Sequence, residues 1–463
     1  MQHDHTQHRV HPRWKGKTAD GGYFEGRGSS EGKGNKASTD KGKPKLHAQA
    51  VLLLVVSGLF GVANALSGTF VGVYLWKAKS DLALLGWFAL ATNIAVAVTF
   101  WLAGKWVKEY NKMNCLRLGV LLSASFYMLV LWLGKHAVDY VIWLGIVQGI
   151  ASGFFWLAFN VVYFEVTDPD NRDRFNGWSG LLGSGAGIVA PWISGILIVR
   201  MAGANGYRLI FSISLGIFLL GILVSFFLKK RKVAGSYEWL LPWRCVKQEG
   251  TPWRSVSAAL VAQGFREGVF GFMIGLMVYI TTASEARLGS FVLITSAVSL
   301  FSFWLTGKYM KPAYRSRAML IGSLAMTALI LPFFWKVNFV TLLIFGIGIS
   351  LFIPLFSIPI LSAVFDLIGG NARSASQREE YIVLRELALN IGRILSVLLF
   401  IAVVSWSTTP LIINSLLLLV GSSMIISWWF MRKQLAANLQ QGPLDKPTIP
   451  ATISGNDCGE KRE

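Results

Sequence analysis

Hydrophobic residues occur in this chain as long runs that polar turns separate. Twelve of these runs have about 20 residues or more, the length an α-helix needs to cross about 30 Å of hydrocarbon. We predict helices at 49–76, 82–104, 113–134, 139–165, 175–200, 207–228, 256–281, 287–307, 316–335, 338–366, 381–405 and 409–431. The pattern therefore predicts an all-α integral membrane protein with 12 transmembrane helices.

The two sets of six helices resemble each other in sequence. Trp101-Leu-Ala-Gly-Lys-Trp-Val-Lys108 and Trp304-Leu-Thr-Gly-Lys-Tyr-Met-Lys311 lie 203 residues apart, and both run from an apolar segment into a basic turn. Two parallel repeats of six helices, related by an axis along the membrane normal, form one large class of secondary transporters. The repeat therefore predicts two parallel six-helix bundles.

Polar segments divide the chain into five predicted parts. These are a disordered basic tail at 1–46, a first bundle at 47–228, a cytoplasmic connector at 229–255, a second bundle at 256–433 and a polar tail at 434–463. The first tail is rich in Gly, Lys and Ser and has no hydrophobic periodicity, which is typical of disorder. Its His3, His5, His8 and His11 either bind a metal or are solvated, and we favour solvation.

Composition and charge refine this interpretation. The chain is 53% hydrophobic and 15% charged, with a mean hydropathy of +0.51, which argues against a soluble protein of 463 residues. A net charge of +20 raises the possibility of nucleic-acid binding. However, 19 lysines and arginines lie in the even-numbered loops and 7 in the odd-numbered ones. Loops rich in Lys and Arg stay on the cytoplasmic side of a membrane, so we expect a multi-pass protein of the cytoplasmic membrane with both termini in the cytoplasm. This distribution explains the positive charge, and we therefore expect no nucleic-acid partner.

Three short motifs carry a family resemblance. The turn after helix 2 reads Gly104-Lys-Trp-Val-Lys108-Glu-Tyr-Asn-Lys112, helix 4 contains Gly145-Ile-Val-Gln148-Gly149, and helix 5 contains Gly183-Ser-Gly185-Ala-Gly187-Ile-Val-Ala-Pro191. In these motifs and its repeat the chain resembles the major facilitator superfamily. It departs from the family at Lys108, where an acidic residue is usual, and at Gly145, where proton-coupled antiporters often carry arginine. The segment Arg378–Asn390 also resembles uncharacterised transporters of spore-forming bacteria.

The resemblance implies that helices 1, 4, 7 and 10 line a central cavity and that helix 11 flanks it. Ionisable residues are costly inside a membrane and usually face a cavity or a partner. Helix 7 carries Arg266 and Glu267, and helix 11 carries Glu386, Asn390 and Arg393 on one face. We predict that Arg266 and Arg393, with Asn390, hold an anionic group of the substrate and that Glu267 or Glu386 couples transport to protons. The alternative is an internal ion pair that braces helices 7 and 11.

The first bundle offers uncharged candidates for the same cavity. Each polar one is either a substrate contact or an interhelical hydrogen bond. The candidates are Asn64, Gln148, Trp156 and Asn160.

Two acidic residues end helices at equivalent positions of the repeat. Glu165 ends the fourth helix and Asp366 the tenth, 201 residues apart. We predict ion pairs from these carboxylates to nearby basic residues, which would hold the cytoplasmic side closed. The alternative is solvated loops, because exposed pairs contribute only about 0–1 kcal/mol. The basic candidates are Lys105, Lys108, Lys308, Lys311, Arg174 and Arg378.

Together these features predict a secondary transporter. The chain lacks the G-x-x-x-x-G-K-[ST] phosphate-binding loop, so we expect a proton gradient rather than ATP to drive it. We expect a monomer in the lipid bilayer with a small-molecule substrate, for which Arg266 and Arg393 favour an anion, and with no cofactor or metal. One alternative is efflux of amphipathic or toxic compounds. Another is a membrane protein that does not transport, such as an enzyme or a sensor.

Overall fold

The computed structural model describes residues 46–167, 169–201, 204–229, 235–369, 374 and 376–437. These residues belong to one compact unit, Lys45–Glu463, and the unit Met1–Pro44 lies outside them. The histidines of the predicted N-terminal tail and nearly all of the predicted C-terminal tail are therefore outside the described residues.

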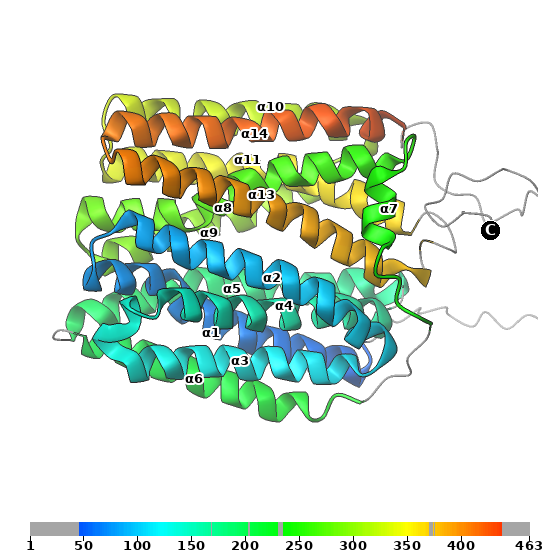
Figure 1. Cartoon of the computed structure of the whole chain (residues 1–463), viewed down its shortest axis with the longest axis horizontal. Coiled ribbons are helices and arrows are strands. Elements are labelled where there is room, and N and C mark those ends of the chain that lie inside the picture. Colours follow the sequence, from blue (N-terminus) through cyan, green and yellow to red (C-terminus); the bar gives the residue numbers. More distant parts are fainter. Residues whose placement is uncertain are drawn as a thin grey trace, which may run out of the picture. The chain divides into compact units, whose positions relative to one another are not determined.

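In the part of the chain that the structure describes, twelve helices are long and apolar enough to cross a membrane, which confirms the predicted fold class. The first bundle consists of α1 (Ala48–Ala78), α2 (Leu82–Glu109), α3 (Lys112–Leu133), α4 (Val141–Val166), α5 (Pro169–Arg200) and α6 (Asn205–Ser225). The second bundle consists of α8 (Pro252–Thr282), α9 (Glu285–Tyr309), α10 (Arg315–Ala328), α11 (Phe339–Ile368), α13 (Arg378–Trp406) and α14 (Pro410–Ala437). A short helix, α7 (Leu241–Lys247), lies in the connector between them (Figure 1).

Prolines explain two differences from the predicted boundaries. The ninth predicted helix runs to 335, but α10 ends at Ala328 and a short 3₁₀ helix, Leu331–Phe334, follows it. Pro332 cannot donate the backbone hydrogen bond that a continuing α-helix needs. Conversely, α5 begins at Pro169, ahead of the predicted start at 175, because proline is favourable in the first turn of a helix.

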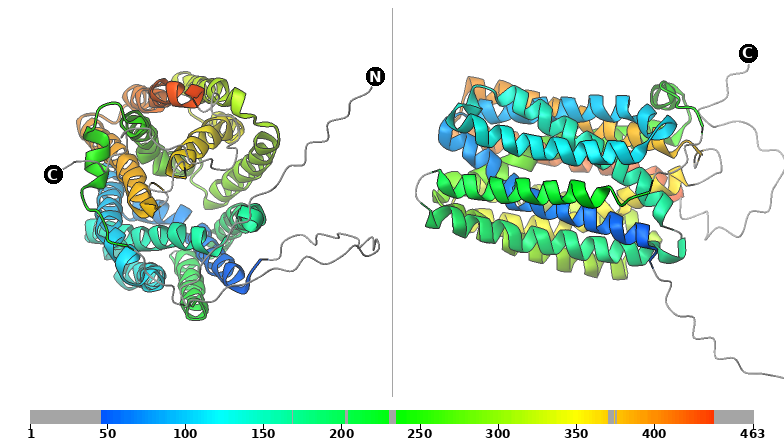
Figure 2. Two further views of the ribbon diagram at one scale, coloured as in Figure 1. Left: turned by 90° about the vertical axis from the view of Figure 1, so that its right-hand side faces the viewer. Right: turned by 90° about the horizontal axis from the view of Figure 1, so that it is seen from below.

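The two bundles meet along two pairs of helices. In the first bundle α4 packs against α2 and α3, and in the second α8 packs against α13 and α14. Between the bundles, α2 packs along α13 and α5 packs along α9 (Figures 1 and 2). Because the repeat relates α2 to α9 and α5 to α13, these two contacts are equivalent to each other.

Glycine lets α8 and α13 approach closely. A Cβ atom on Gly264 would clash with the carbonyl oxygen of Leu389, and one on Gly392 would clash with that of Val261. Small residues of this kind allow the backbones of membrane helices to touch. The contact brings the charged residues of α8 and α13 together in the middle of the second bundle.

We name the two ends of the helices by what lies there. The connector end holds α7 and residues 235–239, and is on the right in Figure 1. The far end is the opposite one, where α1 ends at Ala78 and α9 begins at Glu285.

Candidate functional site

Arg393 lies between two carboxylates in the middle of the second bundle. Its Nη2 is 2.6 Å from Glu267 Oε2, and its Nη1 is 3.9 Å from Glu386 Oε2. Nη1 also donates to Asn390 Oδ1 at 3.3 Å. The predicted common face of Glu386, Asn390 and Arg393 is therefore present, and the face points at α8. The Arg393–Glu267 pair joins the two helices as the predicted brace would.

Further hydrogen bonds satisfy the two carboxylates. Gln263 Nε2 donates to Glu267 Oε1 at 2.8 Å. Arg385 Nη1 is 2.9 Å from Glu386 Oε1. Each carboxylate thus has a guanidinium partner of its own, Arg393 for Glu267 and Arg385 for Glu386.

Arg266 has different surroundings from Arg393. Its side chain is buried, with 6% of its surface exposed, and it forms no ion pair within the described residues. The guanidinium lies 4.7 Å from the centre of the Phe270 ring, one helical turn along α8, which gives a cation–π contact. The sequence assigned the same role to Arg266 and Arg393, and the structure distinguishes them.

A cavity of about 300 Å³ opens beside Arg266 and Glu267 between α8, α9 and α11. Most of its walls are apolar or aromatic. The lining residues include the apolar or aromatic Phe270, Gly271, Phe291 and Phe345 and the polar Thr295 and Ser350. This combination of apolar walls and a few polar groups is typical of a small-molecule site.

The candidates of the first bundle do not line this cavity, as far as the described residues show. Asn64 Nδ2 donates to the Phe60 carbonyl oxygen of its own helix at 3.1 Å. Trp156 is partly exposed and contacts the rings of Phe60 and Phe159. Gln148 and Asn160 lie on α4, away from the cavity walls. Their predicted contact with the substrate stays a prediction.

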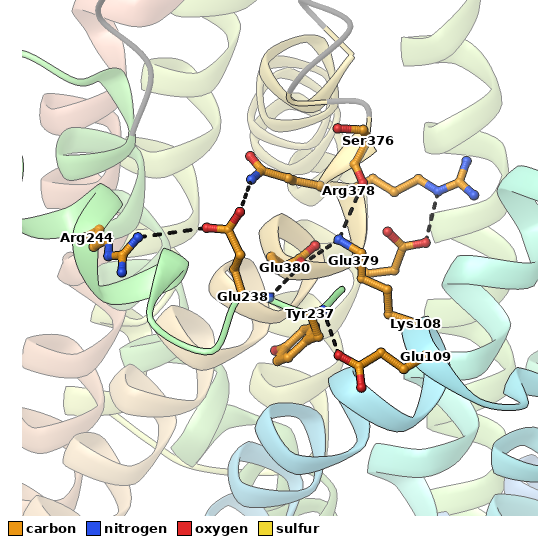
Figure 3. A network of polar contacts seen from close by, with 10 residues as sticks. Lys108, Glu109, Tyr237, Glu238, Arg244, Ser376, Arg378, Glu379 and Glu380 are labelled. Carbon is orange, nitrogen blue, oxygen red and sulfur yellow. Dashed lines mark hydrogen bonds and ion pairs between the residues drawn. The ribbon is translucent and has the colours of Figure 1, made fainter. Parts of the chain in front are cut away.

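The connector end is closed by a buried ion pair between the bundles. Lys108 Nζ on α2 is 2.5 Å from Glu380 Oε1 on α13, with 6% of Lys108 and none of Glu380 exposed (Figure 3). In the family that the sequence resembles, the position of Lys108 usually carries an acidic residue. Here the acidic partner comes from the opposite helix. The sequence interpretation missed Glu380, which lies 272 positions away.

A second group of ion pairs surrounds Glu165 at the same end. Its Oε1 atom is paired with Lys112 and lies 3.4 Å from Arg378 Nη2 on α13. Arg378 Nε is also 3.3 Å from Glu379 Oε1. The pair between Glu165 and Arg378, which connects the two bundles, is one of those predicted.

Other predicted partners differ. Asp366 pairs with Arg315 Nη1 at 3.1 Å instead of with Lys308 or Lys311, because the start of α10 lies nearer to it. Lys308 lies over the ring of Trp304. Lys105 pairs within its own helix with Glu109 at 3.7 Å. The side chain of Arg174 lies outside the described residues.

The connector itself joins the two bundles. The Tyr237 N–H donates to Glu109 Oε1 on α2 at 2.8 Å, and the Glu238 N–H donates to Glu380 Oε1 on α13 at 3.1 Å (Figure 3). Gln377 Nε2 donates to Glu238 Oε1 at 2.8 Å. Burial and, to a smaller extent, the charge of Glu380 raise the pKa of the Tyr237 hydroxyl, so it stays neutral.

The far end has its own ion pair between the bundles, which the sequence interpretation missed. Lys77 Nζ at the end of α1 is 2.9 Å from Glu285 Oε1 at the start of α9. The Tyr207 hydroxyl on α6 donates to the same oxygen at 2.7 Å. Both ends of the molecule therefore hold contacts between bundles, with the cavity of the second bundle between them.

Comparison with known proteins places this geometry in a family. The model of the Major Facilitator Superfamily matches residues 53–376. The uncharacterised protein YqgE of Bacillus subtilis (strain 168) is 40% identical over 355 residues, which are 77% of this chain and 82% of that protein. An uncharacterised protein of Geobacillus stearothermophilus, described as in the sodM 3' region, is 40% identical over 170 residues, 37% of this chain and 79% of that protein.

Solved structures share the fold. A bacterial homologue of the iron transporter ferroportin matches in its inward-facing state with a TM-score of 0.62 and 15% identity, over 85% of this chain and 100% of that one. Its outward-facing state matches with a TM-score of 0.60 and 14% identity, over 84% and 100%. The match to the family model covers most of the chain and agrees with the repeat and the twelve helices. The chain is a multi-pass membrane protein that belongs to the major facilitator superfamily.

Proposed function

We propose that the protein is a secondary active transporter that moves a small solute across the cytoplasmic membrane by alternating access. One observation carries the proposal. Ion pairs between the bundles occur at both ends, at Lys108–Glu380 and at Lys77–Glu285, and the cavity beside Arg266 lies between these levels. A transporter of this class must open and close each end in turn around a central site. The excess of Lys and Arg at the connector end supports a cytoplasmic position for it.

Proton coupling is part of the proposal. Glu267 lines the cavity and is held by Arg393, so a proton on Glu267 would break the ion pair that joins α8 to α13. Glu386 is the second candidate, because it lies within 3.9 Å of the same arginine. A carboxylate that alternates between an ion pair and a proton links a chemical gradient to a change in helix packing.

Efflux of amphipathic compounds is the second candidate function. The aromatic walls of the cavity, Phe270, Phe291 and Phe345, favour it, since such walls accept many flat apolar molecules. Under this alternative the charged residues of α8 and α13 brace the helices and do not contact the substrate.

Transport assays with the purified full chain in proteoliposomes distinguish the candidates. Small anions, amino acids, sugars and cationic dyes are screened for pH changes or currents that depend on the solute. We expect one solute class to give a signal that Glu267→Gln abolishes and that Glu249→Gln, at an exposed connector position, leaves intact. Signals from several unrelated dyes would favour efflux instead. Absence of any solute-dependent signal would contradict transport.

A further inference from the structure

We infer that the cavity between α8, α9 and α11 binds a small organic monoanion with an apolar body, and that Arg266 holds its charged group. The inference names the substrate class of the proposed transporter and depends on that function for its role, although binding itself is measured separately.

The balance of charges between α8 and α13 leaves one cation over. Glu267 is paired with Arg393 at 2.6 Å, and Glu386 is paired with Arg385 at 2.9 Å. Arg266 is the remaining charged side chain of this cluster. A guanidinium keeps its proton in proteins, so it cannot become neutral as a buried lysine does. A buried charge without a partner is costly, and the site therefore favours a negative group from outside.

Neighbouring helices do not supply that negative group within the described residues. On α9, Glu285 lies at the far end and is engaged by Lys77 and Tyr207. On α11, Asp366 lies at the connector end and is engaged by Arg315. The ring of Phe270 faces the guanidinium and compensates its charge only in part. A ligand carboxylate in the cavity would complete the pairing.

The cavity limits the size and shape of the ligand. Its volume of about 300 Å³ equals that of about ten water molecules at about 30 Å³ each, which suits a small organic acid. A Cβ atom on Gly346 would clash with the ring of Phe291, so the glycine lets this ring lie against α11 as a wall. Phe345 and Ile349 continue the apolar surface, and Ser350 adds a polar residue to the wall.

A second negative charge on the ligand would be unfavourable. It would lie near Glu267, and the next guanidinium, Arg393, is already placed between two carboxylates. The site therefore discriminates in two directions, against neutral molecules that leave Arg266 without a partner and against dianions that meet Glu267.

Three probes of similar shape test this discrimination on the purified full-length protein. Benzoate is a monoanion, benzamide is its neutral counterpart and phthalate is a dianion. A ligand that binds the folded state raises the midpoint of thermal unfolding, and calorimetry gives its affinity. We expect benzoate to bind at least about tenfold more tightly than either of the others. Equal affinities for benzoate and benzamide, or no binding of benzoate, would overturn the proposal.

Variants locate the binding. Arg266→Gln should weaken benzoate at least about tenfold. Arg254→Gln removes an exposed guanidinium of the same helix, which pairs with Glu249 and does not line this cavity, and it should change the affinity less than about threefold. Benzoate binding that survives Arg266→Gln would place the anion elsewhere and reject the site.

A second pair of variants keeps the test valid if Arg266→Gln does not fold. A Cβ atom on Gly271, which lines the cavity, meets nothing within 4 Å, so Gly271→Val fills the space and leaves Arg266 in place. Gly307→Val, at an equally open position of α9 that does not line the cavity, is the control. We expect only Gly271→Val to abolish benzoate binding, and loss in both or in neither would contradict the site.

These outcomes separate the site from the proposed function. Binding of benzoate without solute-dependent signals in proteoliposomes would contradict transport and retain the anion site. Transport of another solute class without benzoate binding would retain transport and reject the site.

Discussion

The two ends of the molecule hold the bundles together by different means. At the connector end the ion pair Lys108–Glu380 is almost completely buried, and the backbone of Glu238 donates to the same carboxylate. At the far end Glu285 is buried, but its partner Lys77 is 44% exposed on its side chain. A buried pair costs more to break than an exposed one, because separation leaves a charge without solvent. We therefore expect the far end to open more readily than the connector end.

The largest effect on stability and on the opening of one end should come from reversing the charge of Lys108 at the connector end. Lys108→Glu places two carboxylates side by side in a buried site, and breaking a buried pair costs about 3–5 kcal/mol. The midpoint temperature of thermal unfolding should fall, and the distance between spin labels across this end should increase. Lys105→Glu is the matched control, since the ion pair of Lys105 lies within α2 and its contact with the Trp239 ring of the connector is long, at 5.9 Å. The double variant Lys108→Glu/Glu380→Lys should recover part of the loss, because a lysine at position 380 restores the ion pair but cannot accept the Glu238 N–H. No recovery at all would contradict a direct pair.

An intermediate effect is expected at the far end. Glu285→Gln keeps an oxygen for the Tyr207 hydroxyl but removes the charge that attracts Lys77, which costs about 1 kcal/mol for a half-exposed pair. The population with an open far end should rise, as measured by distances between labels there. Asp81→Asn is the control, because its pair with Lys79 is exposed and does not join the bundles. Equal responses of the two variants would show that the Lys77–Glu285 pair does not hold the far end closed.

The smallest effect on stability should come from removing the Tyr237 hydroxyl in the connector. The Tyr237 hydroxyl is buried and has no hydrogen-bond partner within the described residues. Tyr237→Phe removes a polar group that gains nothing from burial, so stability should stay the same or rise by up to about 1 kcal/mol. Because the raised pKa keeps this hydroxyl neutral, the variant should also leave the dependence of stability on pH between 6 and 9 unchanged. Tyr110→Phe, at an exposed position, is the control, and a clear loss of stability in Tyr237→Phe alone would disprove this description.

The fold was predictable because membrane helices leave a strong local signal. Each long apolar run gave a helix, and the repeat of Trp101–Lys108 at Trp304–Lys311 gave the division into two bundles. Helix ends near proline were less predictable, since Pro332 ends α10 early and Pro169 starts α5 early.

Contacts between the bundles were harder to predict from one sequence. Lys108 and Glu380 are 272 positions apart, and Lys77 and Glu285 are 208 apart, so no local pattern connects them. Asp366 was expected to reach Lys308 or Lys311 and pairs with Arg315 instead. The residues of the charged cluster were identified, but the difference between Arg266 and Arg393 depends on which guanidinium the carboxylates face. Only the packing of α8 against α13 determines that.

Distances measured across both ends of the same molecule test alternating access most directly. Spin labels at Tyr110 and Tyr309 span the connector end, and labels at Trp132 and Trp335 span the far end. All four positions are exposed, and the labels go into a variant without Cys115, Cys245 and Cys458. We expect Lys108→Gln to lengthen the first distance and shorten the second, whereas Lys105→Gln should change neither. If both distances lengthen together, or the far end does not respond, the two ends are not coupled and alternating access is contradicted.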